Sequence, residues 1–337
     1  MNDTNSSREV ASSMQRVLYE VKKVVVGQDH FLERVLVAML AGGHLLVEGV
    51  PGLAKTLTVK TLARALQGSF KRIQFTPDLV PADLIGTRIY NQKSGEFSVS
   101  LGPVFANLLL ADEINRAPAK VQSALLEVMQ EQQVTIAGET YEVPRPFLVM
   151  ATQNPIESEG TYPLPEAQVD RFMMKVLVGY PTADEEFVIV ERVTGVSAAV
   201  AAVASMGQLA ALQQACRGVF VDPSLITYVV RLVGATRDPA RAGVKDLARG
   251  ITYGASPRAS IHLIEGARAL AFLRGRDYVL PEDVMDLVPD VLRHRLVLSY
   301  EALTEGLTPD EIIRRLMAQI APPTKPLESR VRGTSNA

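Results

Sequence analysis

Short, nearly continuous runs of apolar residues recur through the first half of the chain, separated by stretches long enough for helices. Such runs are typical of parallel strands covered on both faces, because neither face then needs polar residues. The pattern therefore predicts an α/β domain built on a parallel sheet. The expected strands are HLLVEG (44–49), RIQF (72–75), NLLLAD (107–112), FLVMAT (147–152) and MMKVLV (173–178).

The second half of the chain changes character, because the strand signals stop after Pro181 and helical periodicity continues to about Ile320. Helix starts with capping residues occur there, for example Thr308 followed by Pro309 and Glu311. We therefore expect an α/β core over residues 16–181 and a smaller all-α domain over residues 182–320. The polar ends, residues 1–15 and 321–337, are predicted to be disordered.

Two segments interrupt the α/β rhythm and are predicted to be β-hairpins, at about residues 86–103 and 131–143. Each pairs two strand-like runs across a short polar turn. They fit ordinary surface hairpins as well as functional inserts.

Charge and cysteine content narrow the classes of function. Lysine and arginine number 35 against 37 acidic residues, with no block of like charge, so the composition does not favour a nucleic-acid-binding surface. Cys216 is the one cysteine and the four histidines are scattered, so no disulfide framework or metal cluster is predicted. Cys216 is expected to be buried. The N-terminus has no apolar signal core, and we expect a cytoplasmic protein.

The stretch GVPGLAKT (49–56) lies between a predicted strand and a predicted helix, as a phosphate-binding P-loop requires. Lys55 is expected to reach the β- and γ-phosphates of ATP, and Thr56 to ligate Mg²⁺. A plain strand-to-helix turn with an exposed lysine is the alternative, which the context disfavours. The residues expected to surround the nucleotide are Gly49, Val50, Pro51, Gly52, Leu53, Ala54, Lys55 and Thr56.

This loop departs from the usual pattern G-x-x-x-x-G-K-[ST], because Ala54 stands immediately before the lysine. A positive φ would strain alanine by about 1–2 kcal/mol. With a negative φ, alanine instead favours the helix and stiffens the loop. We therefore expect Ala54 to enter the helix with a negative φ.

Two further strand ends carry polar residues suited to hydrolysis. LLLADEI (108–114) places Asp112 and Glu113 at the carboxyl end of a strand, where ligands bind in open α/β sheets. Asp112 is expected to hold Mg²⁺ through water, and Glu113 to polarise the attacking water. In FLVMATQNP (147–155) the apolar run leads to Asn154. This residue could hydrogen-bond that water or the γ-phosphate, or it could be an ordinary turn residue before Pro155. The strand before Asn154 is expected to lie between the strands that carry the P-loop and the acidic pair, which favours the contact with the water or the γ-phosphate.

Arg171 in PEAQVDRF and Arg258 in ASPRAS are candidates to neutralise charge on the γ-phosphate. An isolated arginine is more commonly a solvated surface residue. Arg258 has a further argument, because a cation in the first turn of a helix opposes the helix dipole and a ligand would explain its presence.

With these motifs in order, the sequence resembles the MoxR family of AAA+ ATPases, in the helix-2-insert branch. The resemblance covers roughly residues 24–320. It rests on VVGQ, EGVPGLAKT, LLLADEINRAP, VMATQNP, YPLPEAQVDRF and YGASPRA in family order, and on the two hairpins.

The resemblance implies an ATPase core with sheet order 5-1-4-3-2, a helical lid, and a homo-oligomeric ring, typically a hexamer. Gly27 and Gln28 correspond to the segment that lines the adenine pocket. The two hairpins become the helix-2 insert and the pre-sensor-1 insert, which face the ring pore or partners.

The same resemblance assigns roles to the polar residues already named. Asn154 becomes the sensor 1 residue and Arg258 the sensor 2 residue. Arg171 becomes the arginine finger given to a neighbouring subunit, with Arg116 as a second candidate. Catalytic roles are thereby expected for Lys55, Glu113, Asn154, Arg171 and Arg258.

The family resemblance implies an ATP-driven remodeller of protein complexes, with a partner carrying a von Willebrand factor A domain as a separate protein. A nucleic-acid-translocating motor is the alternative, and it should require basic inserts. The second hairpin, however, carries Glu131, Glu139 and Glu142 without lysine or arginine, and the first has only Arg88 and Lys93. A third reading is a scaffold that binds ATP with little hydrolysis, which the complete set of catalytic residues disfavours.

Overall fold

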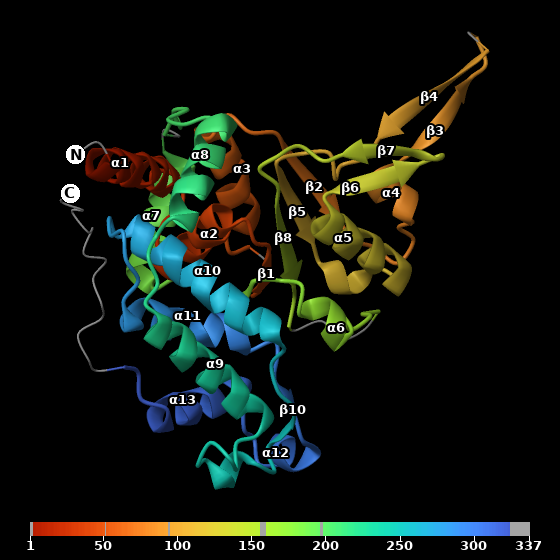
Figure 1. Ribbon diagram of the computed structural model, residues 1–337. Coiled ribbons are helices and arrows are strands. Elements are labelled where there is room, and N and C mark those ends of the chain that lie inside the picture. The colour runs from red at the N-terminus through yellow and green to blue at the C-terminus, as the bar shows by residue number, and fades with distance from the viewer. Residues whose placement is uncertain (1–2, 51, 94, 156–159, 196–197, 324–337) are drawn as a thin grey trace, which may run out of the picture. The chain divides into compact units, whose positions relative to one another are not determined.

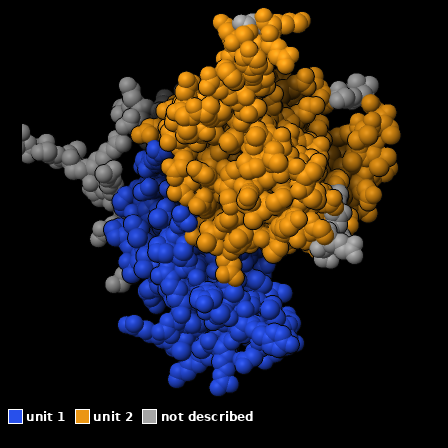
Figure 2. All heavy atoms as spheres, turned by 90° about the vertical axis from the view of Figure 1, so that its right-hand side faces the viewer, with its two compact units in different colours: residues 1, 3, 215–337 blue, residues 2, 4–214 orange. Residues whose placement is uncertain are grey.

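A computed structural model describes residues 3–50, 52–93, 95–155, 160–195 and 198–323. The chain divides into two compact units, here called the core unit (residues 4–214) and the lid unit (from residue 215), coloured orange and blue in Figure 2. The expected disordered tail over residues 321–337 lies outside the described residues from 324 onward. Within the described part, no helix is both long and apolar enough to cross a membrane.

The core unit is built on a five-stranded parallel sheet with the order β2-β5-β8-β1-β9 (Figure 1). When the hairpin strands are left out of the numbering, this is the order 5-1-4-3-2 read from the other edge, so the expected fold is confirmed. The central strands are buried on both faces, as their apolar sequences predict. The strands are β1 (Leu45–Glu48), β2 (Phe70–Gln74), β5 (Leu108–Asp112), β8 (Leu148–Gln153) and β9 (Met174–Leu177).

Helices lie on both faces of this sheet, with α2 and α3 on one side and α5 on the other (Figure 1). The helices of the core unit are α1 (Asp3–Lys22), α2 (Asp29–Ala41), α3 (Lys55–Ala65), α4 (Pro81–Ile85), the 3₁₀ turn η1 (Ile114–Arg116), α5 (Ala119–Glu131), α6 (Glu166–Val169), α7 (Ala183–Thr194) and most of α8 (Met206–Arg217), whose end from residue 215 falls in the lid unit.

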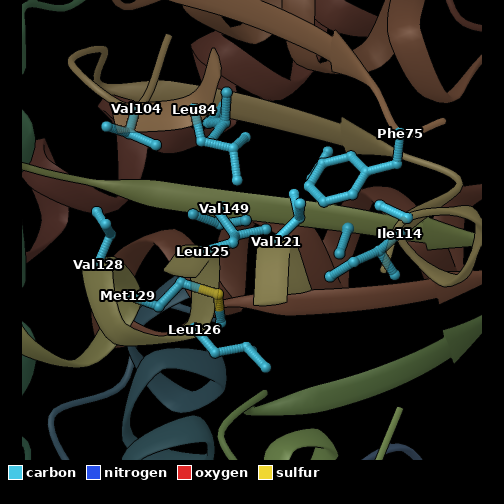
Figure 3. Packing of buried hydrophobic residues seen from close by; sticks show 14 of the residues in the cluster. Phe75, Leu84, Val104, Ile114, Val121, Leu125, Leu126, Val128, Met129 and Val149 are labelled. Atoms are coloured by element: carbon cyan, nitrogen blue, oxygen red, sulfur yellow. The ribbon is translucent and has the colours of Figure 1, made fainter. Parts of the chain in front are cut away.

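Side chains from α4, α5 and the strands form a continuous hydrophobic cluster in the core unit (Figure 3). Val121 and Leu125, one turn apart on α5, share it with Leu84 of α4 and Val149 of β8, and each is at most 1% exposed. Burial of a side chain of this size contributes about 1.5–3 kcal/mol. This packing holds β5 and β8 in place, and with them the polar residues at their ends.

Two antiparallel hairpins are present where the sequence predicts them. The first pairs β3 (Gly86–Asn91) with β4 (Glu96–Leu101), and the second pairs β6 (Gln133–Ile136) with β7 (Glu139–Glu142). Figure 1 shows the β3–β4 hairpin projecting away from the sheet. The β6–β7 hairpin is anchored in the hydrophobic cluster by Val134 and Ile136, whereas β3 and β4 are mostly exposed.

The expectation of a disordered N-terminal tail over residues 1–15 is wrong from Asp3 onward, because α1 is helical from there. The reason lies in the second half of this helix. Met14, Val17 and Val21 form a stripe at helical spacing, and all three are at most 1% exposed. This buried stripe accounts for the helix despite the polar residues that precede it.

The boundary between the units also differs from the expected position near Pro181. The residues before 215 belong to the core unit, and hydrogen bonds explain why. Ala204 donates its N–H to the carbonyl of Ala65, and Gln213 donates from Nε2 to the carbonyl of Met39 at 2.6 Å. The change from strands to helices in the sequence therefore does not coincide with the division into units.

The lid unit is helical except for a short antiparallel pair of strands, β10 (Ile251–Tyr253) and β11 (Val297–Leu298). Cys216, in the last turn of α8 and just past the boundary between the units, is buried as expected, and burial raises the pKa of its thiol to about 12, as is typical of a structural cysteine. Its other elements are α9 (Pro223–Arg237), the 3₁₀ turn η2 (Lys245–Leu247), α10 (Pro257–Leu273), α11 (Pro281–Leu292), α12 (Tyr300–Thr304) and α13 (Pro309–Gln319).

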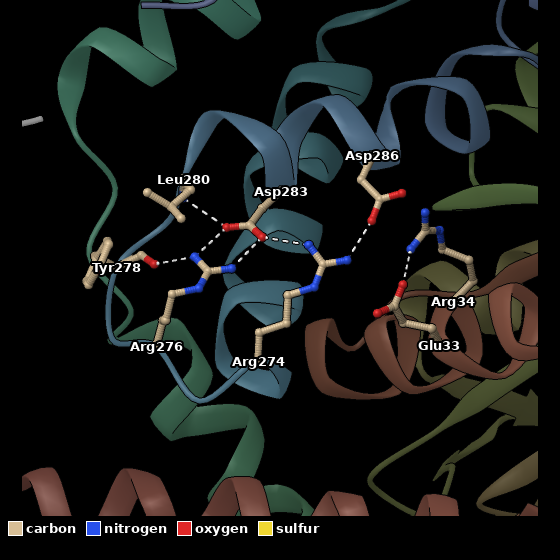
Figure 4. Close-up of polar contacts among 8 residues, drawn as sticks. All are labelled: Glu33, Arg34, Arg274, Arg276, Tyr278, Leu280, Asp283 and Asp286. Atoms are coloured by element: carbon tan, nitrogen blue, oxygen red, sulfur yellow. Dashed lines mark hydrogen bonds and ion pairs between the residues drawn. The ribbon is translucent and has the colours of Figure 1, made fainter. Parts of the chain in front are cut away.

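A buried carboxylate joins α10 to α11 in the lid unit (Figure 4). The side chain of Asp283 is 1% exposed and accepts hydrogen bonds from Arg274 at 3.0 Å and from Arg276 at 2.6 and 2.7 Å. It also accepts the N–H of Leu280, the N-cap residue of α11, at 2.9 Å. Because a buried charge is costly unless it is paired, these bonds fix the turn between the two helices.

His44, immediately before β1, is a buried histidine held between two backbone groups. The N–H of Val149 donates to Nδ1 at 3.0 Å, and Nε2 lies 3.1 Å from the carbonyl of Met129. Only the neutral ring with its proton on Nε2 satisfies both contacts. Burial lowers the pKa of His44 to about 4, while the bond to Met129 acts in the opposite sense.

We predict that His44 makes the protein less stable in mild acid. Its pKa is about 4 when folded and 6.5 when unfolded, so between these values the unfolded chain binds the proton first. The contribution of His44 to the free energy of unfolding is complete above pH 6.5. As the pH falls towards 4, up to about 3 kcal/mol of it is lost. Urea unfolding at several pH values measures this. The control His44→Gln keeps a donor for Met129 but cannot titrate, so its free energy of unfolding should change less with pH than that of the wild type. An equal change with pH in the two proteins would contradict the prediction.

Candidate nucleotide-binding site

A cavity of about 390 Å³ lies at the carboxyl ends of the parallel strands, within the core unit. The loop after β1, the start of α3 and the ends of β2, β5 and β8 contribute to it. It brings together described residues of the P-loop, the acidic pair and Asn154. Its lining residues are Gly49, Gly52, Leu53, Ala54, Lys55, Thr56, Leu57, Arg72, Gln74, Asp112, Glu113, Thr152, Gln153 and Asn154.

The P-loop connects the end of β1 to the first residue of α3, Lys55. Lys55 Nζ donates to the carbonyl of Gly49 at 2.5 Å, which draws the two ends of the loop together. Gly49 permits a close approach, because a Cβ there would lie 2.5 Å from the carbonyl oxygen of Val178. No side chain caps the N-terminus of α3, so its first N–H groups suit an anion. Val50 is not among the lining residues, and Pro51 lies outside the described residues.

Ala54 does not enter the helix with a negative φ, and that expectation is wrong. It is the N-cap residue of α3 with φ 55° and ψ 16°, in the left-handed region. The pattern glycine is therefore replaced by alanine at a position that does require positive φ, at a cost of about 1–2 kcal/mol. The loop must turn sharply between Gly52 and Lys55, and the packing of β1 and α3 on either side imposes this conformation.

The electrostatics of the cavity centre on Lys55. Burial lowers the pKa of Lys55, because the ammonium loses water, whereas the carboxylates of Asp112, Glu113 and Glu48 act in the opposite sense. Phosphate groups near Lys55 would favour its charged form in the same way as these carboxylates.

The carboxylate of Asp112 is held on both oxygens. Thr152 Oγ1 donates to Oδ1 at 2.6 Å, and Arg72 donates to Oδ2 from Nε at 3.1 Å and from Nη2 at 2.7 Å. The same Thr152 hydroxyl accepts the backbone N–H of Glu113 at 2.9 Å. Thr152 thus ties the end of β5 to the end of β8 at the cavity.

Glu113, the residue after β5, has a positive φ of 56° and is the N-cap of η1. Its Oε2 accepts a hydrogen bond from Gln74 Nε2 at 2.8 Å and lies 3.0 Å from Arg116 Nε. A strained backbone together with two donors fixes its carboxylate beside the cavity.

Arg72, Gln74 and Thr152 line the cavity but were not among the residues predicted from the sequence. Arg72 and Gln74 stand two residues apart on β2, and side chains at that spacing point to one face of a strand. Their signal was the polar pair within the apolar run RIQF and its flanks, at the carboxyl end of a sheet strand.

The segment predicted to line an adenine pocket also has special geometry. Gly27 has φ +64°, and a Cβ there would lie 2.3 Å from Glu185 Oε1. Gln28 is the N-cap of α2 with φ 56°, and its Oε1 is a buried acceptor for which the described residues provide no donor. An amino group of a bound base is a donor of the kind this atom needs.

The candidate arginines have different surroundings. Arg171 is half-buried and donates to the carbonyl of Leu126 at 2.9 Å. Arg116 pairs with Glu113 of its own chain. Arg258 is exposed at the second residue of α10 in the lid unit, where its N–H bonds to Ser256 Oγ at 3.2 Å. None of these three arginines lines the cavity of the core unit.

Comparison with known proteins agrees with these motifs. Residues 44–174 match the family described as ATPase family associated with various cellular activities (AAA), and residues 246–316 match the AAA lid domain. The chain is 57% identical to the chaperone MoxR1 of Mycobacterium tuberculosis, over 92% of this chain and 82% of that protein. It is 33% identical to the protein MoxR of Methylorubrum extorquens, over 94% of this chain and 96% of that one.

The chain belongs to the MoxR family of AAA+ ATPases. A crystal structure of a protein from Cytophaga hutchinsonii, described as a candidate ATPase, is similar across nearly the whole chain, with 50% identity and a TM-score of 0.90. That similarity covers 94% of this MoxR-family chain and 97% of the other. The fold and the family inferred from the sequence are therefore confirmed.

We predict that glycine is better accommodated than alanine at position 54. Ala54→Gly removes the left-handed strain of about 1–2 kcal/mol but adds flexibility to the unfolded chain, so the free energy of unfolding should rise by up to about 1 kcal/mol. The matched control Ala63→Gly, in the interior of α3, should lower it by about 1 kcal/mol or more, because Ala63 is also buried. Urea unfolding measures both variants, and a loss of stability in Ala54→Gly would contradict the positive φ.

Proposed function

We propose that this MoxR-family chain hydrolyses ATP, with Mg²⁺, in a homo-oligomeric ring and uses the reaction to remodel protein complexes. The observation that supports it most is the convergence of Lys55, Asp112, Glu113 and Asn154 on one cavity of about 390 Å³. Three separate strand ends supply these residues, and each has the chemistry that phosphoryl transfer requires.

The residues present fit the nucleotide and the metal. The uncapped start of α3 and Lys55 suit the phosphates, and the orphaned acceptor of Gln28 suits an amino group of the base. Thr56 and Asp112 offer oxygen ligands of the kind that Mg²⁺ prefers, Asp112 through water. Bound there, the metal would neutralise charge on the phosphates.

In the proposed reaction, Glu113 accepts a proton from water as the water oxygen attacks the γ-phosphorus. The bond from that phosphorus to the bridging oxygen breaks, which releases ADP and phosphate. Asn154 holds the water or a γ-phosphate oxygen. Lys55 and the lid residue Arg258, as sensor 2, stabilise the negative charge that develops.

Replacement of Glu113 tests hydrolysis directly. Glu113→Gln keeps the size of the side chain and an acceptor for Gln74 but removes the proton acceptor, so turnover should fall at least about 100-fold. Nucleotide affinity, measured by titration with a fluorescent ATP analogue, should be retained. Glu127→Gln, at an exposed position of α5, is the matched control and should keep full turnover. Unchanged turnover in Glu113→Gln would remove Glu113 from the mechanism.

The ring is proposed because the arginine finger acts between subunits. Arg171 is not among the residues that line the cavity of its own chain, which is compatible with a role at a neighbouring site. Arg116 is the weaker candidate, since it pairs with Glu113 of the same chain. The typical hexamer of the family is the stoichiometry we propose.

Mixed subunits test this arrangement. Arg171→Ala alone should bind ATP but lose turnover, because the neighbouring site lacks its finger. Mixed with Glu113→Gln, it should regain part of the wild-type turnover, since each intact Glu113 can then meet an intact Arg171 from the adjacent subunit. Turnover of the mixture no greater than the sum of the separate variants would contradict a role in trans.

The surface chemistry supports a protein client rather than a nucleic acid. The β6–β7 hairpin carries Glu139 and Glu142 and no lysine or arginine. The β3–β4 hairpin exposes large apolar side chains, among them Tyr90 at 51% and Phe97 at 58%. The chaperone designation of the Mycobacterium tuberculosis relative points the same way. We propose a cytoplasmic remodeller whose partner with a von Willebrand factor A domain is a separate protein.

A further inference from the structure

Asp112, the carboxylate proposed to bind the metal, is bound by a cation of this chain. Arg72 donates to Asp112 Oδ2 from both Nε and Nη2, at 3.1 and 2.7 Å. The other oxygen, Oδ1, accepts the hydroxyl proton of Thr152 at 2.6 Å. The Arg72 side chain is 47% exposed, so water and ions can reach the pair. A metal-bound water at Asp112 would therefore meet a carboxylate whose two oxygens already accept hydrogen bonds, one of them from a cation.

The same guanidinium is linked to Glu113 through one side chain. Arg72 Nη2 also donates to Gln74 Oε1 at 2.9 Å, and Gln74 Nε2 donates to Glu113 Oε2 at 2.8 Å. Because the amide oxygen of Gln74 faces Arg72, its NH₂ group must face Glu113. Arg72 thus orients the group that restrains the proposed proton acceptor.

Charge makes the metal and Arg72 compete for Asp112. A divalent ion held through water at this carboxylate would carry a charge of the same sign as the Arg72 guanidinium, and the two would repel. When Arg72 leaves Asp112, it loses its two bonds to that carboxylate, and Gln74 loses the donor that fixes its amide. The hold of Gln74 on Glu113 weakens as a result.

We propose that Arg72 is a positioning residue that competes with the metal for Asp112 and, through Gln74, restrains Glu113 until the metal is bound. Arg72 and Gln74 lie on β2, whereas the P-loop and the acidic pair lie on other strands. The coupling thus makes the orientation of Glu113 depend on whether Asp112 holds the metal. It rests on the function proposed above.

The experiment is a Mg²⁺ titration of the full chain with a slowly hydrolysed ATP analogue, which measures the Mg²⁺ concentration for half-maximal binding. Arg72→Gln should lower this concentration about tenfold, because the competing cation is gone. The matched control Lys71→Gln removes the same charge from the adjacent exposed position of β2 and should leave the value unchanged. An unchanged value in Arg72→Gln would overturn the proposal.

Arg72→Lys tests whether the positive charge or the planar guanidinium group is responsible, because lysine keeps the charge but not the paired N–H donors. It keeps a cation near Asp112, so the Mg²⁺ requirement should return close to the wild-type value. If Arg72→Lys lowers the Mg²⁺ concentration for half-maximal binding as much as Arg72→Gln does, charge competition is not the cause. If Arg72→Gln instead weakens binding of the analogue without Mg²⁺, Arg72 is a phosphate ligand and the proposal is overturned.

The outcomes also separate this inference from the proposed function. If the wild-type chain does not bind the analogue with Mg²⁺, the proposed function fails and the inference with it. If the wild-type chain binds it and hydrolyses ATP, while Arg72→Gln has the wild-type Mg²⁺ requirement, only the inference about Arg72 fails.

Discussion

The parallel pairing of β5 with β2 on one side and with β8 on the other is the constraint on which the site depends. The register sets Gln74 opposite Asp112, and Ala111 opposite Ala151. Neighbouring strands lie about 4.8 Å apart, so side chains at their carboxyl ends come within hydrogen-bonding reach. A shift of one residue would turn these side chains to the other face of the sheet. The hydrophobic cluster around α5 therefore positions the polar residues, although none of its members lines the cavity.

Two residues that line the cavity have a strained backbone conformation. Ala54 and Glu113 both have positive φ, which is unfavourable for residues with a side chain. Ala54 is the last residue before the helix that carries Lys55, and Glu113 is the last before η1. The packed elements on either side stabilise these conformations, because a residue in the left-handed region persists only where its surroundings require it. Both of these positions line the cavity.

Outside the cavity, different interactions stabilise the two units. The core unit covers its sheet with helices and attaches α1 and the segment before residue 215 by buried apolar side chains and backbone hydrogen bonds. The lid unit relies in part on the buried charges around Asp283, which hold the turn between α10 and α11. The helix starts of the lid unit at Ser256 and Thr308 are both capped by those side chains, and the cap at Thr308 is the one predicted above from the sequence.

The sequence by itself determined the strands, their order through the family resemblance, both hairpins and most of the cavity, because P-loop, acidic pair and Asn154 each follow an apolar run. Tertiary structure alone decided the positive φ of Ala54, the helix at the N-terminus and the division near residue 214. It also decided that Arg72 and Gln74 reach Asp112 and Glu113, nearly forty positions further along the chain. Local patterns report which residues form an element, whereas contacts between distant elements depend on register and packing, which no single segment encodes.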